Sequence, residues 1–217
     1  MKRIPELELM DRDDQAASYA QADFSASNNI FINNLFEQTS INSKTKILDV
    51  GCGDGEIPIM LFEKTKCQLT AIDGSENMLN QFIMKKEKYN IKGIQIYKKL
   101  INGNLFPSTV FDIVITNSVL HHISDVFMFW KNLIRLIGPT GKIIVMDLVR
   151  PKTNLELQKK LEKYGGSDPI LLSDFENSLK AAYTIDEVTA QLKTFNEITF
   201  TIKTVSDRHF FATINKR

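Results

Sequence analysis

The stretch KILDVGCGDG, residues 46–55, indicates how this chain folds. Its first five residues, up to Val50, form a mostly apolar run with the length of a short buried β-strand. Three glycines follow, and residues 57–64 then have a composition that fits a helix. Glycines at a turn between a strand and a helix let the backbone come close to a ligand, because no Cβ blocks the approach. The stretch therefore predicts a ligand-binding turn.

An acidic residue, Asp73, closes the next apolar run, twenty residues beyond Gly53. A carboxylate in that place can bind both hydroxyls of a ribose, so the turn and the acid together predict a nucleoside-bearing cofactor. Glu56 replaces the last glycine of a dinucleotide-binding turn, and Asp49 adds a second carboxylate beside it. Both suit a pyrophosphate poorly. A cationic cofactor without phosphate fits better, and S-adenosylmethionine, with its sulfonium and ammonium groups, is such a molecule.

The chain resembles the class I S-adenosylmethionine-dependent methyltransferases over most of its length. Four segments carry the resemblance, in the order and at the spacing of that family: residues 47–55, 71–75, 111–123 and 138–145. The resemblance implies an α/β fold with a doubly wound, Rossmann-like sheet of seven strands and a C-terminal antiparallel hairpin. It also implies N-terminal helices and a helical insertion after the fifth strand, two regions that this family often uses to cover the substrate.

The order of expected elements along the chain agrees with such a sheet. Strands are predicted near 46–50, 68–73, 94–97, 111–116 and 142–147, and helices near 57–64, 75–89 and 124–137. This alternation is typical of a parallel, doubly wound sheet. We expect a single domain, residues 1–217, with cap helices in residues 1–40, a helical lid in residues 151–183 and two final strands near 198–205 and 209–214.

Composition limits the function classes. The net charge is +1, with 27 basic and 26 acidic residues, which argues against an electrostatically driven nucleic-acid surface. The only cysteines, Cys52 and Cys67, have neither zinc-site nor disulfide-framework spacing, and we expect no metal. With no signal peptide and no apolar run near the ~20 residues of a membrane helix, we expect a cytoplasmic protein that does not enter the membrane. We expect it to be a monomer or a homodimer.

The expected cofactor-binding residues lie in the glycine turn and at the ends of the following strands: Asp49, Gly51, Cys52, Gly53, Asp73, Gly74, Met78, Leu100, Ile101 and Asn117. Asp73 is assigned to the ribose, and Met78 to the adenine pocket. Relatives in the family often have an acidic residue after the third strand that accepts from the adenine amino group. Leu100 stands near that place, so the partner of the amino group is not identified.

Candidate catalytic residues follow the fourth strand or lie in the N-terminal helices. His121 and His122 should face the methyl group, and a histidine can be a general base at neutral pH, or can only orient a loop or the cofactor. Tyr19 falls where the N-terminal helices would cover the cofactor. Arg150, after the fifth strand, is a candidate for binding a substrate carboxylate or phosphate, with a surface salt bridge as the alternative.

These features predict in-line transfer of a methyl group from S-adenosylmethionine to a small-molecule acceptor. Two alternatives remain open at this stage: a methyltransferase acting on protein or RNA, and a cofactor-binding module without turnover. An NAD-dependent oxidoreductase is a more distant alternative, because the glycine turn departs from the dinucleotide pattern.

Overall fold

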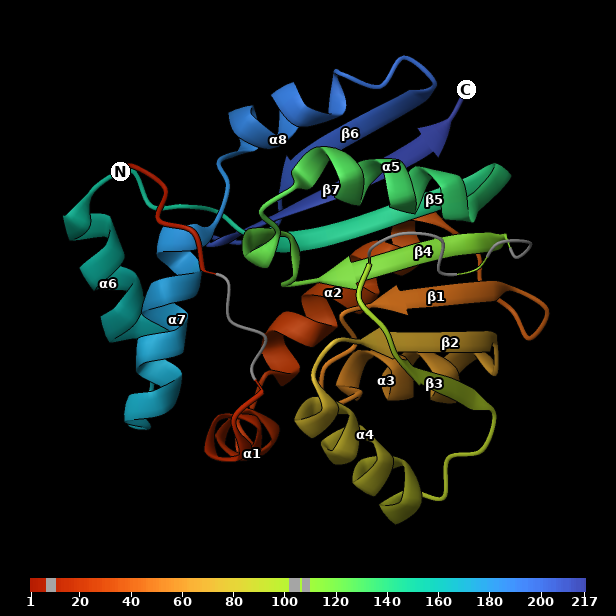
Figure 1. Cartoon of the computed structure of the whole chain (residues 1–217), viewed down its shortest axis with the longest axis horizontal. Coiled ribbons are helices and arrows are strands. Elements are labelled where there is room, and N and C mark those ends of the chain that lie inside the picture. Colours follow the sequence, from red (N-terminus) through yellow and green to blue (C-terminus); the bar gives the residue numbers. More distant parts are fainter. Residues whose placement is uncertain (7–10, 102–105, 107–109) are drawn as a thin grey trace.

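The computed structural model describes residues 1–6, 11–101, 106 and 110–217, and its centre is a seven-stranded sheet (Figure 1). The strand order is β3-β2-β1-β4-β5-β7-β6. The strands are β1 (Lys46–Val50), β2 (Gln68–Asp73), β3 (Ile94–Lys98), β4 (Phe111–Asn117), β5 (Ile137–Leu148), β6 (Ile198–Thr204) and β7 (His209–Lys216). Strands β1 to β5 are parallel, and β7 lies antiparallel between β5 and β6. The predicted doubly wound sheet with a C-terminal hairpin is confirmed.

Most of the helices lie where the sequence predicts them. They are α1 (Asp13–Gln21), α2 (Ser25–Gln38), α3 (Glu56–Thr65), α4 (Glu76–Lys88), α5 (Val126–Leu136), α6 (Asn154–Tyr164), α7 (Pro169–Ala181) and α8 (Ile185–Leu192), with a 3₁₀ turn, η1 (Leu120–His122), after β4. Side-chain caps explain several starts, because Ser75 accepts the Met78 N–H and Thr184 with Glu187 forms a full capping box.

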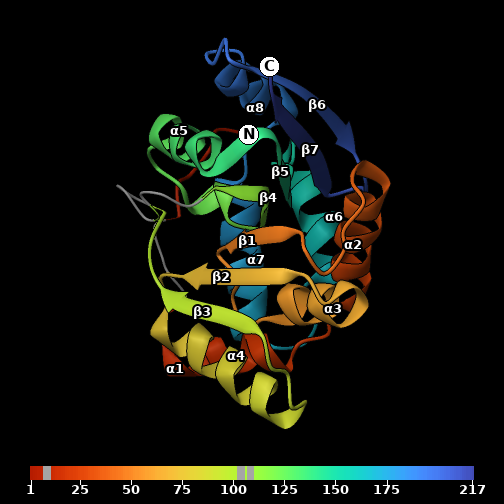
Figure 2. The ribbon, with the colours of Figure 1, turned by 90° about the vertical axis from the view of Figure 1, so that its right-hand side faces the viewer.

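The sheet is covered on both faces, as its alternating side chains require. One face packs against α2, α3 and α4, and the other packs against α5 and α8 (Figure 2). In β1, for example, Ile47 belongs to the first of these cores and Leu48 to the second, and both are fully buried. Each such side chain contributes roughly 1.5–3 kcal/mol through burial, which fixes the register of the strands.

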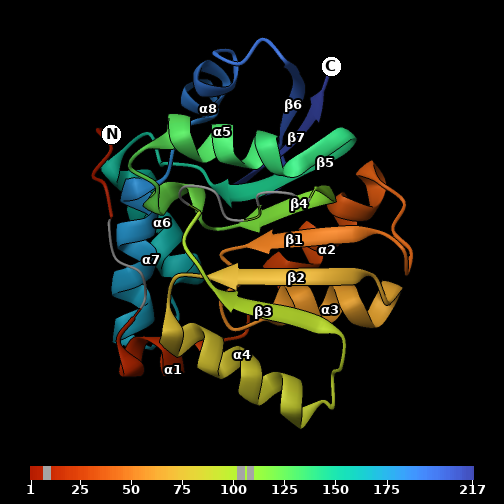
Figure 3. The same ribbon diagram turned by 45° about the vertical axis from the view of Figure 1, so that its right-hand side comes forward.

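The parallel strands place their carboxyl ends at one edge of the sheet, and this edge contains the site. Strands β1, β2 and β4 end there at Val50, Asp73 and Asn117 (Figure 3). Strand β1 lies between β2 and β4, so the chain changes direction across the sheet at this point. Ligands of doubly wound folds bind beyond such a switch point.

The segments that precede β1 and follow β5 lie next to that edge. Helix α7 contacts both α1 and η1, and α6 lies on its outer side (Figure 1). The N-terminal segment lies against α7, where the Ile4 N–H donates to the Lys180 carbonyl at 3.0 Å. The guanidinium of Arg3 donates to the carbonyls of Ala181 (2.6 Å) and His121 (2.8 Å). The first six residues are therefore attached to the carboxyl edge of the sheet.

Candidate functional site

The glycine turn after β1 has a backbone that only glycine adopts without strain. Gly51, Gly53 and Gly55 have φ angles of 72°, 53° and 82°, in the left-handed region. The N–H groups of Gly51 and Cys52 both donate to the Ile72 carbonyl, at 2.8 and 3.0 Å. The turn is thereby bonded to the end of β2, and the two motifs recognised in the sequence form one structural unit.

The carboxylate of Asp73 is held at this junction by the main chain. It accepts from the Gly53 N–H and the Ser75 N–H, each at 2.8 Å. Burial raises the pKa of Asp73 above its usual value, although these main-chain hydrogen bonds oppose the shift. Because the two donors fix its orientation, the carboxylate presents acceptor lone pairs to a ligand in a defined direction.

A cavity opens at the carboxyl ends of β1, β2 and β4. Eight of the ten expected cofactor-binding residues line it: Gly51, Gly53, Asp73, Gly74, Met78, Leu100, Ile101 and Asn117. The cavity thus combines the acceptor groups of Asp73 with an apolar wall. The expected place for a partner of the adenine amino group is near Leu100, within residues 99–102. Asn102 lies outside the described part of the chain.

A second, smaller cavity adjoins the first and is acidic. Asp49, Asp54 and Glu56 line it, and Tyr19, Gly51 and Asn117 line both cavities. Burial, with a smaller contribution from the charge of Asp73, raises the pKa of Asp49 to about 8. Asp49 therefore keeps its proton at neutral pH until a cation approaches, which qualifies the expectation of a permanent negative charge there.

Lys85 of α4 partly balances the negative charge of the second cavity. The ammonium of Lys85 contacts the carboxylates of Asp54 and Glu56, the latter at 2.8 Å. Two acidic side chains and one basic side chain meet at the wall, and the buried Asp49 lines the same cavity. The arrangement favours a ligand group with positive charge.

The sequence assigned Cys52 to the cofactor, but its side chain lines neither cavity. It is 7% exposed, and its Sγ lies 3.9 Å from the Gly53 carbonyl. Burial raises the pKa of the thiol well above its usual value, so the thiol is not a nucleophile at neutral pH. Its main-chain N–H donates to the Ile72 carbonyl within the turn, and the expectation that the main chain of Cys52 approaches the cofactor stays a prediction.

Tyr19 and Asn117 stand where the two cavities meet. The Tyr19 ring lies 4.5 Å from the Phe24 ring, and burial, followed by the charges of Asp54 and Asp73, raises the pKa of its phenol. The phenol is therefore a hydrogen-bond donor and not a base. Among the described residues, the side-chain oxygen of Asn117 is buried without a hydrogen-bond partner. A buried acceptor of this kind is costly unless a ligand satisfies it.

The two histidines of η1 have different surroundings. His122 lines the first cavity, and burial, followed by the charge of His121, lowers its pKa to about 3. Its ring is neutral at physiological pH and is a weak base. His121 is 2% exposed and does not line either cavity; its Nδ1 lies 2.6 Å from Oδ1 of Asp147. Of the two histidines expected to face the ligand, His122 lines the first cavity and His121 does not.

Asp147 is ionised at this buried position. Burial alone would raise its pKa, but the charge and hydrogen bond of His121, with the Leu148 N–H, hold the pKa below its usual value. The pair joins the end of β5 to η1 and fixes the orientation of the His121 ring.

The structure gives Arg150 a role other than the expected contact with substrate. Its guanidinium donates to the carbonyls of Met1 (3.1 Å) and Ala182 (2.9 Å) and to the carboxylate of Glu187 (2.6 Å). It is 7% exposed and lines neither cavity. Its three nitrogens each donate one hydrogen bond within the fold, and the assignment of Arg150 to substrate binding stays a prediction.

Several lining residues were not singled out in the sequence. In the first cavity they include Lys99, Ser118, Val119 and Ile123. Ser118, Val119 and Ile123 lie between β4 and α5, within the fourth-strand motif of residues 111–123, so the motif could have indicated them as lining residues. Ser118 has a left-handed φ of 57°. Asn28 of α2 lines the second cavity. No local pattern identifies it, because its position depends on how α2 packs. Residues 151–183 line neither cavity in the described structure.

Comparison with known families decides between the cofactor classes. A family model described as a methyltransferase domain matches residues 41–178, which contain the glycine turn, Asp73 and the loop after β4. The chain belongs to this methyltransferase family. The resemblance to class I S-adenosylmethionine-dependent methyltransferases is thereby confirmed, and S-adenosylmethionine is the cofactor that the family implies.

Curated methyltransferases align with part of the chain. An uncharacterized methyltransferase of Schizosaccharomyces pombe is 31% identical over 126 residues, which cover 55% of this chain and 43% of that protein. A ubiquinone biosynthesis O-methyltransferase of Rickettsia akari is 33% identical over 110 residues, which cover 51% of this chain and 43% of that protein. The match thus spans less than half the length of either relative.

Solved methyltransferases share the whole fold. A putative S-adenosylmethionine-dependent methyltransferase from Methanococcus maripaludis has a TM-score of 0.75 at 16% identity, covering 98% of this chain and 97% of that one. The plantazolicin methyltransferase BpumL in complex with SAH has a TM-score of 0.74 at 15% identity, covering 94% and 90%. Identity this low supports the fold alone. Within the described residues, no helix is long and apolar enough to span a membrane.

Proposed function

We propose that this methyltransferase transfers the methyl group of S-adenosylmethionine to a small-molecule acceptor. The observation that carries the proposal is the pair of adjoining cavities. The first is lined by Asp73 and apolar side chains, and the second is acidic. S-adenosylmethionine has a matching division, since an adenosine group and an amino-acid group with an ammonium and a carboxylate meet at its sulfonium, and the ammonium suits the acidic cavity.

The residue roles follow from this division. Asp73 binds the ribose hydroxyls in the first cavity, where Met78, Leu100 and Ile101 pack against the adenine. Asp49 lies in the second cavity with the ammonium group. The sulfonium then falls at the junction, next to the residues that line both cavities.

Tyr19, Gly51 and Asn117 are those junction residues. The free side-chain oxygen of Asn117 accepts from the cofactor or the acceptor, and the protonated Tyr19 donates. His122 borders the same end of the first cavity as a neutral ring. Because its pKa is low, His122 orients the acceptor better than it removes a proton.

The reaction is a direct displacement. A nucleophilic atom of the acceptor attacks the methyl carbon opposite the sulfur, the carbon–sulfur bond breaks, and S-adenosylhomocysteine leaves with the bonding electrons. No covalent enzyme intermediate forms. Holding two reactants in line and excluding water lowers such a barrier by roughly 7–11 kcal/mol. This chain supplies that positioning through the rigid turn after β1 and the loop after β4.

The net charge of the chain and the names of its curated relatives both support a small-molecule acceptor. The net charge of +1 argues against an electrostatically driven nucleic-acid surface. Curated relatives include a ubiquinone biosynthesis O-methyltransferase and a demethylmenaquinone methyltransferase, whose names describe small acceptors. We propose that this chain works on the same class of acceptor, in the cytoplasm.

The test has two steps that separate binding from turnover. Calorimetry first compares S-adenosylmethionine with NAD, and only the former is expected to bind. The chain is then incubated with methyl-labelled S-adenosylmethionine and a cell extract separated into metabolite, protein and RNA fractions. Label in the metabolite fraction supports the proposal, and Asp73→Ala should abolish it. Label in protein or RNA contradicts the acceptor class, and binding without labelling in any fraction favours a non-catalytic module.

A further inference from the structure

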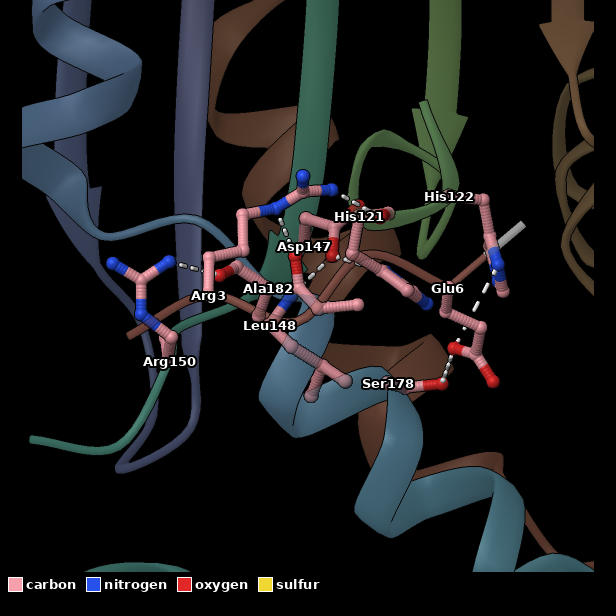
Figure 4. A network of polar contacts seen from close by, with 10 residues as sticks. Arg3, Glu6, His121, His122, Asp147, Leu148, Arg150, Ser178 and Ala182 are labelled. Atoms are coloured by element: carbon pink, nitrogen blue, oxygen red, sulfur yellow. Dashed lines mark hydrogen bonds and ion pairs between the residues drawn. The ribbon is translucent and has the colours of Figure 1, made fainter. Parts of the chain in front are cut away.

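Three side chains with metal-binding atoms converge beside the first cavity. Glu6 comes from the N-terminal segment, and His121 and His122 come from η1 (Figure 4). One candidate ligand atom from each residue lies within 4.8 Å of the other two. None of the roles assigned above requires these three groups to meet.

His121 is oriented as metal-binding histidines usually are. Its Nδ1 lies 2.6 Å from Oδ1 of Asp147, and both side chains are almost fully buried. A carboxylate at one ring nitrogen fixes the orientation of the ring, and a metal ion at the other nitrogen takes the place of any proton there. That outer nitrogen points toward the space between Glu6 and His122 (Figure 4).

The contact between His122 and Glu6 has the spacing of two ligands and not that of a hydrogen bond. Nδ1 of His122 is buried without a hydrogen-bond partner among the described residues, and Oε2 of Glu6 lies 3.8 Å away. Hydrogen bonds between nitrogen and oxygen rarely exceed about 3.2 Å. Two ligands at about 2.0–2.1 Å from a tetrahedral ion lie about 3.4 Å apart, so a small adjustment would suffice.

Glu6 is attached to the fold and is not a loose terminal residue. The hydroxyl of Ser178 donates to its Oε2 at 3.0 Å, and the bonds of Arg3 and Ile4 hold the preceding segment against α7. The cluster contains two carboxylates, Glu6 and Asp147, and the guanidinium groups of Arg3 and Arg150 lie beside it (Figure 4). Arg150 is paired with Glu187 at 2.6 Å, which leaves Arg3 opposite the two carboxylates. Its charge suits a cation.

We propose that Glu6, His121 and His122 bind one divalent first-row transition-metal ion, with Asp147 as the residue that orients His121. Two imidazoles and one carboxylate are a donor set of zinc sites that keep a position open. The inference revises the expectation of no metal, which rested on cysteine spacing. It goes beyond methyl transfer and does not depend on it. Because His122 also lines the first cavity, the ion lies at the wall of the reaction space.

The experiment measures zinc binding to the full chain without cofactor or acceptor. The protein is treated with a chelator, desalted and titrated with ZnCl₂ in a calorimeter. We expect one ion per chain, with affinity reduced at least tenfold in Glu6→Gln and His122→Asn. Asp147→Asn should weaken binding by about 10–100-fold, as loss of such an orienting partner does elsewhere. Glu37→Gln, the same change at an exposed surface pair, should bind as the wild type does.

Two results would overturn the proposal. One is the absence of saturable zinc binding in the wild type. The other is equal affinity in the wild type, Glu6→Gln and His122→Asn, with all three folded by circular dichroism. The visible spectrum of Co²⁺ added to the wild type gives a readout that needs no variant: intense bands of a nitrogen-ligated ion support the site, and the weak spectrum of hydrated cobalt contradicts it. Failure here leaves the proposed methyl transfer untouched, because neither cofactor nor acceptor is present.

Discussion

The main-chain N–H of Gly53 donates to Oδ2 of Asp73 at 2.8 Å, although the two residues lie twenty positions apart in the sequence. This bond joins the glycine turn after β1 to the acid at the end of β2. A second N–H, that of Ser75, donates to the other carboxylate oxygen. The acid is thus oriented by the same turn whose backbone approaches the cofactor, and neither motif forms the site alone.

Removal of the Asp73 carboxylate should weaken cofactor binding. Asp73→Ala removes the proposed acceptors of the ribose hydroxyls, and hydrogen bonds to a charged group are worth about 1.5–3 kcal/mol each. We expect at least a tenfold loss of affinity for S-adenosylmethionine by calorimetry, and a smaller loss for Asp73→Asn. Glu76→Gln, at an exposed pair three residues further on, is the control and should bind normally. Unchanged affinity in a folded Asp73→Ala would remove the ribose assignment.

Most strands could be predicted because their signal is local. The buried runs that end at Val50 and Asp73 need only a few consecutive residues to be recognised, and both boundaries agree with the structure. Strand β5 is different, since it begins at Ile137, five residues before the predicted start at 142. Ile137 pairs with Phe111 across an irregular register, and that pairing depends on a strand 26 residues earlier. The periodicity of the residues around Ile137 contains no information about this pairing, so the start of β5 could not be predicted from it.

Alanine at Gly51 should destabilise the fold by more than backbone strain alone. A Cβ there would lie 2.2 Å from Cγ2 of Val119, at a φ of 72°. Left-handed backbone costs a non-glycine residue about 1–2 kcal/mol, and overpacking adds about 1–3 kcal/mol. We expect Gly51→Ala to lower the free energy of unfolding in urea by about 2–5 kcal/mol.

Gly166 provides a matched control for that measurement. Its φ of 66° is similar, but nothing lies within 4 Å of a Cβ added there. Gly166→Ala should therefore cost only the strain, about 1 kcal/mol. If both variants lost the same free energy of unfolding, contact with Val119 would have no part in the requirement for glycine at position 51.

Residues at strand ends could be placed in the cavity from the sequence, whereas the surroundings of residues held by long-range contacts could not. Asn117 and Asp73 follow directly from the position of β4 and β2. His121, in contrast, does not line either cavity, and its Nδ1 lies 2.6 Å from Oδ1 of Asp147, 26 residues further along the chain. Arg150 bonds to the carbonyl of Met1, 149 residues earlier. Both contacts join residues that are far apart in the sequence and meet only in the folded chain, so no local sequence pattern predicts them.

Loss of the Arg150 guanidinium should reduce stability and leave cofactor binding unchanged. Breaking a buried ion pair costs about 3–5 kcal/mol, and less where one partner is exposed. Because the Glu187 side chain is 40% exposed, we expect Arg150→Ala to lose about 2–3 kcal/mol in urea unfolding. Lys98→Ala, at an exposed pair with Glu76, should show no measurable change. A large loss of cofactor affinity in Arg150→Ala, at unchanged stability, would restore the role in ligand binding.

The protonation of Asp49 should make both stability and cofactor binding depend on pH. Its folded pKa is about 8 because of burial and the nearby Asp73, whereas an unfolded aspartate titrates near 3.9. Between these values the folded chain holds a proton that the unfolded chain has lost, so stability falls as pH rises, by at most about 1.4 kcal/mol per pH unit. Asp49→Asn should remove this slope in urea unfolding at a series of pH values.

Cofactor binding should respond in the opposite direction. The ammonium of S-adenosylmethionine favours the ionised Asp49, so binding releases the proton, and affinity should rise with pH up to about 8, by at most about tenfold per unit. Calorimetry in buffers of different ionisation enthalpy measures the released proton directly. Asp49→Asn should bind with no proton release and a flat profile. A wild-type profile that is also flat would place the ammonium away from Asp49, and the acidic cavity would then need another explanation.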